Sequence, residues 1–469
     1  MKFAKPVRTA LAVLMLSFPA LEAQAALNAV DPVPYLEANG FFPAWYQDTN
    51  GRALELCLST AVIAADAARG LAGGAGCTLL ANPGVFDPAQ PIVFPATASD
   101  CPNTDTTICN FPDESFWFMG DAQINSGGVV VNYVSNLEAA FASGLPTAGG
   151  QISFARIRIR VSLPANAPAG NYTVIHPYGV EVFNIPAGGV KVVNLTRDVG
   201  IGGSTDFTGP LKGDIGPFLM DASVPTQGLI PGTDGVSFFV GDPNSLRPVV
   251  GSPFGTNFLR IEGPAGFTPV QQNLFTVMGK VFTTEVLPTP ALIERTTYSR
   301  AAGATVGSVV AQQDVFVKAP PTSVSVTFEE PSAAVTTMTD GDKSGGWFGQ
   351  STNPPVPGGL ISVRAANPPL NSDVTTTSTL VDLITISKAE ATCSAGSCSI
   401  TVEAASSDQV AVPTLTVNGT TDMAPVVAGG TLQTATFTVS PIPPAQVTVT
   451  STNGGSDTEN VVVVEPVLP

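Results

Sequence analysis

Phe154-Ala155-Arg156-Ile157-Arg158-Ile159-Arg160-Val161 is the stretch that decides the fold class of this chain. Successive side chains of a β-strand point to opposite faces, so its aliphatic residues share one face and its three arginines share the other. The pattern predicts a half-buried strand. We expect the arginine face to meet carboxylates of a neighbouring strand or domain. An anionic ligand is the alternative partner for these three charges.

Short strand-like runs continue to the end of the chain, separated by turns rich in Gly and Pro. Their spacing, with Thr outward and Val or Ile inward, predicts a mainly β protein built of β-sandwich domains. A strand pair is predicted at 172–185, around Pro177-Tyr178-Gly179. The further predicted strands lie at 189–195, 236–240, 258–261, 312–318, 323–328, 383–387, 398–403, 434–439 and 445–450.

One or two short helices are expected in the N-terminal region. Leu54–Arg69 is rich in Ala and Leu. Asn136–Ser143 follows Ser135 and contains Glu138, the residue pair of a capping box. A helix of two turns does not persist alone, so we expect it to pack on a sheet.

The first 25 residues have the composition of a secretory signal peptide. Lys2, Lys5 and Arg8 precede an apolar run, and Ala23-Gln24-Ala25 supplies the small-x-small cleavage pattern. We therefore expect a secreted protein, extracellular or at the cell surface. Later apolar runs stay below about 18 residues, so no transmembrane segment is expected in the mature chain.

Length suggests about three mature domains. After the signal peptide at 1–25, we expect an N-terminal disulfide-containing region at 26–145, a β-rich middle domain at 146–320 and a C-terminal region at 321–469. The stretch Lys318-Ala-Pro-Pro-Thr322 is the predicted linker.

Six cysteines in an exported chain predict disulfides. Cys393 and Cys398 flank four residues between two strand-like runs, which suits a bridged hairpin. The four N-terminal cysteines allow three connectivities. The pairing that closes the smallest loops joins Cys57 to Cys77 and Cys101 to Cys109. The chain has no Cys-x-x-Cys pair, so a zinc site is not favoured.

The C-terminal segment resembles the immunoglobulin-like modules of bacterial exported and surface proteins. The resemblance is carried by Ile-Thr-Ile-Ser-Lys-Ala-Glu at 384–390, the hairpin after it and Val-Thr-Val-Thr-Ser-Thr-Asn-Gly-Gly at 447–455. The upstream region is similar to uncharacterised secreted bacterial proteins, through Pro-Ala-Trp-Tyr-Gln-Asp at 43–48 and His-Pro-Tyr-Gly at 176–179. The resemblance implies export and a C-terminal immunoglobulin-like module. It brings no catalytic residue.

Charge and histidine content exclude several function classes. The chain has 37 acidic and 20 basic residues, so no nucleic acid partner is expected. Its one histidine, His176, stands before Pro177, with no Gly-x-Ser-x-Gly motif anywhere. Histidine-based hydrolases and histidine or cysteine metalloenzymes are therefore excluded. We expect His176 to be buried or to cap a turn.

Carboxylate chemistry stays open, because a hydrolase with paired carboxylates needs no histidine. Glu329 and Glu330 stand at a strand end before a proline, and we expect both to be solvated. Asp340-Gly-Asp342-Lys-Ser344-Gly has oxygen donors at alternating positions and a glycine at the sixth, as calcium loops begin. The closing Glu is missing. A polar turn is the favoured interpretation, and calcium through Asp340, Asp342 and Ser344 is the alternative; no other cofactor is expected.

The aromatic residues Phe41, Phe42, Trp45 and Tyr46 form a cluster near the start of the mature chain. We expect it to pack under its domain, and a sugar-stacking platform is the alternative. Together these patterns favour an exported, non-catalytic structural or adhesive protein. Its expected partners are other surface proteins, further copies of itself or extracellular polysaccharide. A carbohydrate- or calcium-binding protein and a paired-carboxylate hydrolase are the rival functions.

Overall fold

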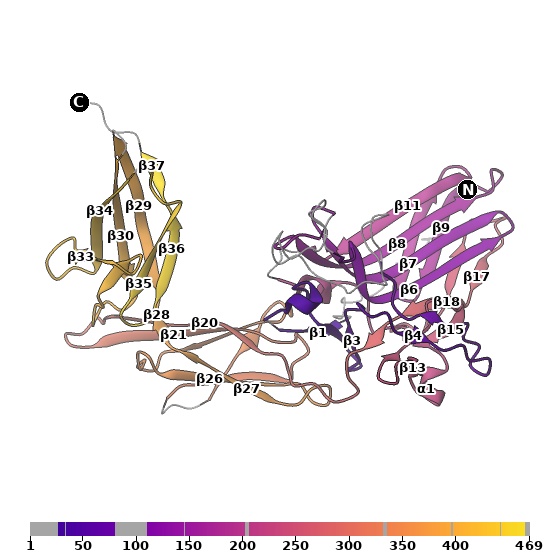
Figure 1. Cartoon of the computed structure of the whole chain (residues 1–469), viewed down its shortest axis with the longest axis horizontal. Helices are drawn as coiled ribbons and strands as arrows, with labels where there is room; N and C mark the ends of the chain where they lie inside the picture. The colour runs from indigo at the N-terminus through magenta and orange to yellow at the C-terminus, as the bar shows by residue number, and fades with distance from the viewer. Residues whose placement is uncertain are drawn as a thin grey trace, which may run out of the picture.

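The chain folds almost entirely into antiparallel β-sheets, as its sequence predicts. A computed structural model describes residues 27–79 and 110–464, apart from residues 33, 145, 202–205, 332–334, 395–396 and 441. The predicted signal peptide and the predicted Cys101–Cys109 pair lie outside the described residues. Figure 1 shows a large N-terminal domain, then a sandwich, and then a second sandwich whose strands run across those of the first.

A seven-stranded sheet is the centre of the large domain. Its long strands bury Trp117, Ile157 and Ile159 on one face, where a four-stranded and a six-stranded sheet cover them. The seven strands, in order across the sheet, are β11 (Gly189–Val199), β8 (Gln151–Leu163), β7 (Val129–Phe141), β6 (Glu114–Ser126), β18 (Leu274–Met278), β15 (Arg247–Val250) and β12 (Met220–Asp221).

The covering sheets are made of shorter strands. The four-stranded sheet runs β10 (Gly179–Ile185), β9 (Gly170–His176), β16 (Leu259–Glu262) and β17 (Val270–Gln272). The six-stranded sheet runs β1 (Leu27–Val30), β2 (Trp45–Asp48), β3 (Ala53–Glu55), β19 (Lys280–Val281), β14 (Phe238–Phe239) and β13 (Ile230–Pro231). The small elements are 3-10 helices η1 (Glu37–Asn39) and η2 (Gly209–Lys212), helix α1 (Val224–Gln227) and the hairpin β4 (Val62–Ile63) and β5 (Gly74–Ala75).

The two sandwiches have separate hydrophobic cores. The middle sandwich comprises β20 (Leu292–Ala302), β21 (Val309–Lys318), β22 (Ser325–Glu329), β23 (Thr336–Thr337), β24 (Thr339–Asp340), β25 (Gly346–Ser351), β26 (Leu360–Ala366), β27 (Val374–Thr379) and β28 (Val381–Asp382). The C-terminal sandwich comprises β29 (Ile384–Ser394), β30 (Ser397–Ser406), β31 (Leu415–Val417), β32 (Thr421–Asp422), β33 (Ala424–Pro425), β34 (Leu432–Val439), β35 (Gln446–Ser451), β36 (Ser456–Asn460) and β37 (Val462–Val464).

The two sandwiches are repeats of one topology. One sheet of the middle sandwich has the order β24-β25-β21-β20-β28 and the other β23-β22-β26-β27. Adding nine to each strand number gives the two sheets of the C-terminal sandwich. In both, the last strand pairs in parallel with the first, which carries a bulge, at Glu294 or at Ser387.

Both predicted N-terminal helices are wrong. Asn136 to Phe141 belongs to β7, which is bonded on one side to β6 and on the other to β8. Leu137 and Ala139 are buried in the core, so pairing on both edges outweighs the local capping pattern. The Leu54–Arg69 stretch contains the end of β3, all of β4 and Cys57, which forms a disulfide with Cys77, instead of a helix.

The predicted divisions at 145 and 320 do not separate domains. β7 and β8 lie on either side of position 145 and pair along twelve residues. Position 320 lies between β21 and β22, whose Val317 and Val326 share one core. The 321–469 region therefore holds part of the middle sandwich and the whole C-terminal sandwich. The alternation of apolar and polar residues predicts which face of a strand is buried, but it does not tell which strands share a sheet.

Candidate functional site

A cluster of buried side-chain amides joins the large domain to the middle sandwich. Asn28 on β1 donates to Gln47 Oε1 on β2 (2.7 Å) and to Asn371 Oδ1 (3.0 Å). Asn371 donates in turn to Gln47 Oε1 (2.9 Å), and Asn367 donates to Asn28 Oδ1 (3.0 Å). Thr322 also donates to Asn28 Oδ1. Because the four amides are buried and bonded to one another, they define one relative position of the two domains.

A second polar cluster joins the middle sandwich to the C-terminal one. Tyr298 on β20 donates its hydroxyl to Asp408 Oδ2 (3.0 Å), and Arg300 forms an ion pair with the same carboxylate. The Asp408 side chain is fully buried. Asn453 donates to the Tyr298 hydroxyl (2.9 Å), and the backbone N–H of Arg300 donates to Ser407 O (3.0 Å). The Arg300–Asp408 ion pair and the backbone hydrogen bond thus join the two sandwiches at the same point of contact.

The two joints use equivalent loops. The middle sandwich contacts the large domain through its β21–β22 loop, which contains Thr322, and its β26–β27 loop, which contains Asn371. The C-terminal sandwich contacts its predecessor through β30–β31, with Asp408, and β35–β36, with Asn453. Under the nine-strand repeat these are the same two loops. Each sandwich therefore docks on the preceding domain with the same end.

Close backbone approach tightens the second joint. Gly455 follows Asn453 in the β35–β36 loop, and its N–H donates to Asp382 Oδ1 on β28 (3.0 Å). A Cβ at Gly455 would lie 2.2 Å from the Asp382 carbonyl oxygen. Gly454 beside it has a φ of +92°. These two glycines let the loop lie directly against the middle sandwich.

An open cleft lies beside the first joint, between the large domain and the middle sandwich. It encloses about 220 Å³ and is lined on one side by β1, Tyr35 and η2 and on the other by the chain before β20 and after β21. Clefts at domain interfaces are common sites for small ligands. Its polar side chains are Asp31, Tyr35, Asp206, Thr208, Lys212, Lys318 and Ser344.

Burial and charge perturb the ionisable groups of this cleft. Burial raises the pKa of Asp31, although the N–H of Ala44 donates to its Oδ2 (2.8 Å). Burial, assisted by the charges of Asp31 and Asp206, raises the pKa of Tyr35 to about 12. Burial opposes ionisation of Asp206, but hydrogen bonds from Thr208 together with Lys318 hold its pKa below the usual value. The two carboxylates of the cleft thus differ in acidity.

The predicted calcium loop lies at the rim of this cleft, where Ser344 contributes to the lining. Asp340 Oδ2 accepts the N–H of Gly345 (2.8 Å), and Asp342 Oδ1 accepts the N–H of Ser344 (3.1 Å). The carboxylates therefore close a polar turn. Within the described ranges, no group of three or more His, Cys, Asp or Glu side chains is arranged to hold a metal. Calcium binding here remains a prediction.

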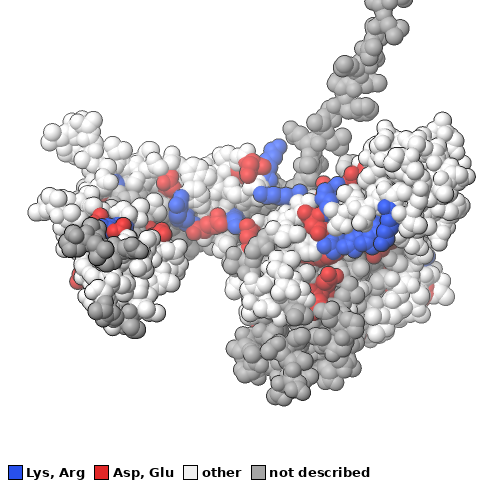
Figure 2. Space-filling view, turned by 90° about the horizontal axis from the view of Figure 1, so that it is seen from above, with Lys and Arg blue, Asp and Glu red and all other residues white. Residues whose placement is uncertain are grey.

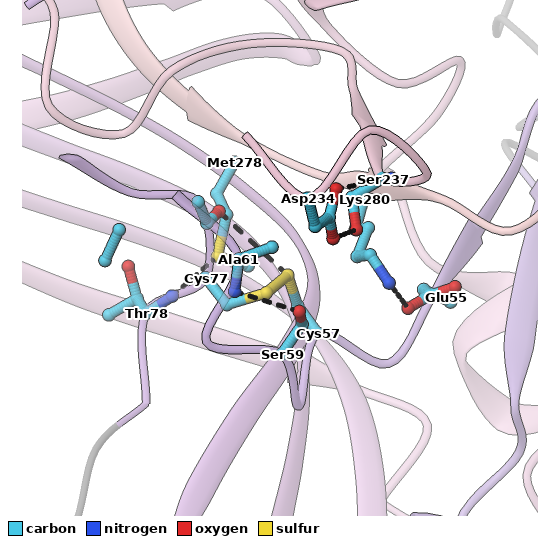
Figure 3. The surroundings of a disulfide bond; sticks show 12 residues. Glu55, Cys57, Ser59, Ala61, Cys77, Thr78, Asp234, Ser237, Met278 and Lys280 are labelled. Atoms are coloured by element: carbon cyan, nitrogen blue, oxygen red, sulfur yellow. Dashed lines mark hydrogen bonds and ion pairs between the residues drawn. A yellow bond between two sulfur atoms is a disulfide. The ribbon is translucent and has the colours of Figure 1, made fainter. Parts of the chain in front are cut away.

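Two disulfides join the pairs expected from loop length, Cys57–Cys77 and Cys393–Cys398. The first is buried and holds a loop against Phe116 of β6 and Met278 of β18. Figure 3 shows its surroundings, where the N–H of Thr78 donates to the Met278 sulfur (3.0 Å). The Lys280–Glu55 ion pair lies nearby (2.5 Å). The first disulfide staples this loop to the central sheet; the second bridges the β29–β30 hairpin.

The aromatic cluster and the histidine are structural. Phe42, Trp45 and Tyr46 are buried, and Tyr46 packs edge-on against Trp117 with ring centres 4.8 Å apart. These rings therefore offer no sugar-stacking platform. His176 is fully buried, its Nδ1 accepts the N–H of Tyr178 (3.3 Å), and burial lowers its pKa to about 3. It is neutral and caps a turn, as predicted.

Glu329 and Glu330 are both predicted to be solvated, and this is correct for only one of them. Glu329 is exposed, but Glu330 is buried and accepts a hydrogen bond from Gln313 Nε2 (2.8 Å). A hydrogen-bond partner on the facing strand, which the sequence pattern does not reveal, compensates for its burial.

The arginine stripe meets carboxylates at one end. Arg156 pairs with Glu138 on β7 (2.9 Å) and with Asp198 on β11 (2.7 Å), as the charge balance predicts. Burial raises the pKa of Glu138 to about 7. Arg160 bonds to a neutral amide on β11, and Arg158 forms no ion pair within the described residues. Figure 2 shows basic and acidic side chains lying next to one another on the surface seen from above, rather than in separate patches.

The sequence patterns do not predict the residues that join the domains. Asn28, Asn367 and Asn371 match no motif, and the Pro-Ala-Trp-Tyr-Gln-Asp stretch that contains Gln47 gave no role to that residue. The four come from two segments more than 300 residues apart. One hint exists: Asn28 interrupts an apolar strand, Leu-Asn-Ala-Val, at a position where burial requires a partner. Asp408 lies in the β30–β31 loop, where it forms an isolated bridge with Arg300, and it gives no comparable hint.

Comparisons with known proteins identify no relative. No protein-family model matches the chain, and no curated protein does. Among solved structures, the surface layer protein SbsC, domains 1–6, aligns with 74% of this chain at 11% identity and a TM-score of 0.14. The chain spans half the length of that structure. No helix of the described residues is long and apolar enough to cross a membrane.

Proposed function

We propose that this protein is an exported, non-catalytic structural or adhesive component of the cell surface or extracellular matrix. In this proposal two immunoglobulin-like sandwiches hold the large domain in a fixed position. The secretory leader and the cysteine pairs favour export. Other surface proteins, further copies of itself or extracellular polysaccharide are the proposed partners.

The repeated joint is the observation that carries the proposal. Domains within a chain usually move relative to each other unless their interface is extensive. Here both sandwiches dock with the same two loops, and both contacts contain buried polar side chains with assigned partners. A satisfied buried network favours one geometry over its alternatives, because any shift leaves polar groups without partners. Such joints suit a protein that bears load or presents a domain at a set angle.

Electron microscopy of the purified mature chain tests this rigidity. We expect one particle shape, with a constant angle between the domains. Asn371→Ala removes a central member of the first amide cluster and should broaden the distribution of angles there. Asn184→Ala, which removes an exposed amide on β10, is the matched control. A wild-type chain with freely variable angles would contradict the proposal.

Location and assembly need their own test. Antibodies against the large domain should label intact, unpermeabilised cells or the surrounding matrix. Sedimentation over a concentration series separates self-association from binding to a different partner. Labelling confined to permeabilised cells would reject an exported role.

A hydrolase with paired carboxylates is the second candidate function, and the cleft is the observation that favours it. Asp31 and Asp206 both line the cleft and have pKa values displaced in opposite directions. Such a contrast is the arrangement by which one carboxyl acts as an acid and the other as a base. Release of reducing ends from a polysaccharide panel, abolished by both Asp31→Asn and Asp206→Asn, would establish this function in place of the structural one.

A further inference from the structure

We infer that the cleft between the large domain and the middle sandwich binds a small organic cation, a protonated primary amine with an apolar body. The amine would pair with Asp31 and the body would lie against the apolar walls. This site does not depend on the proposed structural role, because a rigid scaffold works with or without a ligand in the cleft.

The walls of the cleft are held in place before any ligand binds. The wall from the large domain includes Ala29 and Val30 of β1, the strand whose Asn28 anchors the buried amide cluster. On the other side, the N–H of Ala319 donates to Gly345 O (3.0 Å), which ties two lining segments together. Because the cleft is already formed, no binding free energy is spent on ordering its walls.

The lysine beside Asp206 is already paired. Lys318 lies between two carboxylates, Glu294 (3.2 Å) and Asp206 (3.7 Å). The other lysine of the lining, Lys212, forms no ion pair within the described residues. The lining holds two carboxylates and two lysines, so the preference for a cation comes from the position of Asp31 and not from an excess of negative charge.

Asp31 is the carboxylate that remains without a cation. It forms no ion pair with any residue of the described ranges, and one backbone N–H, from Ala44, donates to its Oδ2. Its second oxygen remains available to a ligand. A partly buried carboxylate in an apolar cleft gains more from an ammonium group than an exposed one does, because less water competes for it.

The remaining lining selects the rest of the ligand. Pro32, Leu211, Pro290, Leu292 and Pro320 supply apolar surface. The volume of about 220 Å³ corresponds to about seven water molecules at about 30 Å³ each. A metal ion fits less well, because hard cations require several oxygen ligands and Asp31 is a single carboxylate.

Benzylamine and benzyl alcohol are a matched pair of probes for this site. Both carry the same apolar body, but only benzylamine is cationic at pH 7. Isothermal titration calorimetry on the full mature chain should show binding of benzylamine and at least tenfold weaker binding of benzyl alcohol. Asp31→Asn preserves the shape and removes the charge, so it should weaken benzylamine binding at least tenfold. Asp373→Asn is the control, because it removes an exposed, ion-paired carboxylate that does not line the cleft.

A second variant guards against misfolding of the first. Ser344→Phe adds a large side chain to the cleft from the opposite wall and leaves Asp31 in place. It should also abolish benzylamine binding, while circular dichroism shows an unchanged fold. Equal affinity for the amine and the alcohol, or unchanged amine binding in either variant, overturns the inference. Polysaccharide cleavage and particle shape are separate measurements, so this result does not decide either proposed function.

Discussion

Asp408→Ala is the substitution expected to release the C-terminal sandwich from the middle one. The Asp408 carboxylate is fully buried and accepts hydrogen bonds from Tyr298, Arg300 and the N–H of Ala411 (3.0 Å). Breaking a buried ion pair costs about 3–5 kcal/mol. The Arg300 side chain is 21% exposed, so water screens part of its charge and the lower end, about 3 kcal/mol, applies. That is a loss of about 100-fold in the docking equilibrium.

Differential scanning calorimetry and small-angle X-ray scattering of the mature chain measure this loss. We expect an earlier, separate unfolding transition for the C-terminal sandwich and a larger radius of gyration. Arg364→Ala breaks an exposed ion pair on the middle sandwich, 53% and 44% exposed, and should cost at most about 1 kcal/mol. If Asp408→Ala behaves like this control in both measurements, the joint is not held by the buried carboxylate.

Three further predictions concern local features. Replacing both cysteines by serine should lower the free energy of unfolding by about 3 kcal/mol for Cys57–Cys77, which has a sequence separation of 20. The same change should lower it by about 2 kcal/mol for Cys393–Cys398, which has a separation of 5. Equal losses in urea unfolding would contradict this ranking. Gly455→Ala forces a Cβ against a carbonyl of β28 and should increase the radius of gyration, whereas Gly341→Ala, in open space, should not. His176 has its pKa lowered to about 3, so the unfolded chain takes up a proton below pH 6.5 that the folded chain does not. Stability should therefore fall as the pH drops from about 6.5 toward 3, and His176→Gln should reduce that slope in urea titrations.

Local sequence patterns predicted the strands well and the helices badly. The stretch 154–161 forms the middle of β8, with Ile157 and Ile159 in the core and its arginines on the opposite face. Alternation is a reliable guide because it follows directly from strand geometry. The capping box at Ser135 and Glu138 is a weaker local preference. In the structure this segment is a strand paired on both sides, and Glu138 forms an ion pair with Arg156 instead of capping a helix.

The sequence by itself determined the β class, the burial of His176 and the pairing of cysteines that lie close along the chain. Each of these depends on neighbours within a few tens of residues. Only the tertiary structure decided the repeat of the two sandwiches, the joints and the cleft, because Asn28 meets Asn371 and Tyr298 meets Asp408 across long separations. Such contacts follow from which strands share a sheet and which loops emerge at the same end. Residue type and periodicity along the chain predict neither the strand neighbours nor the positions of the loops.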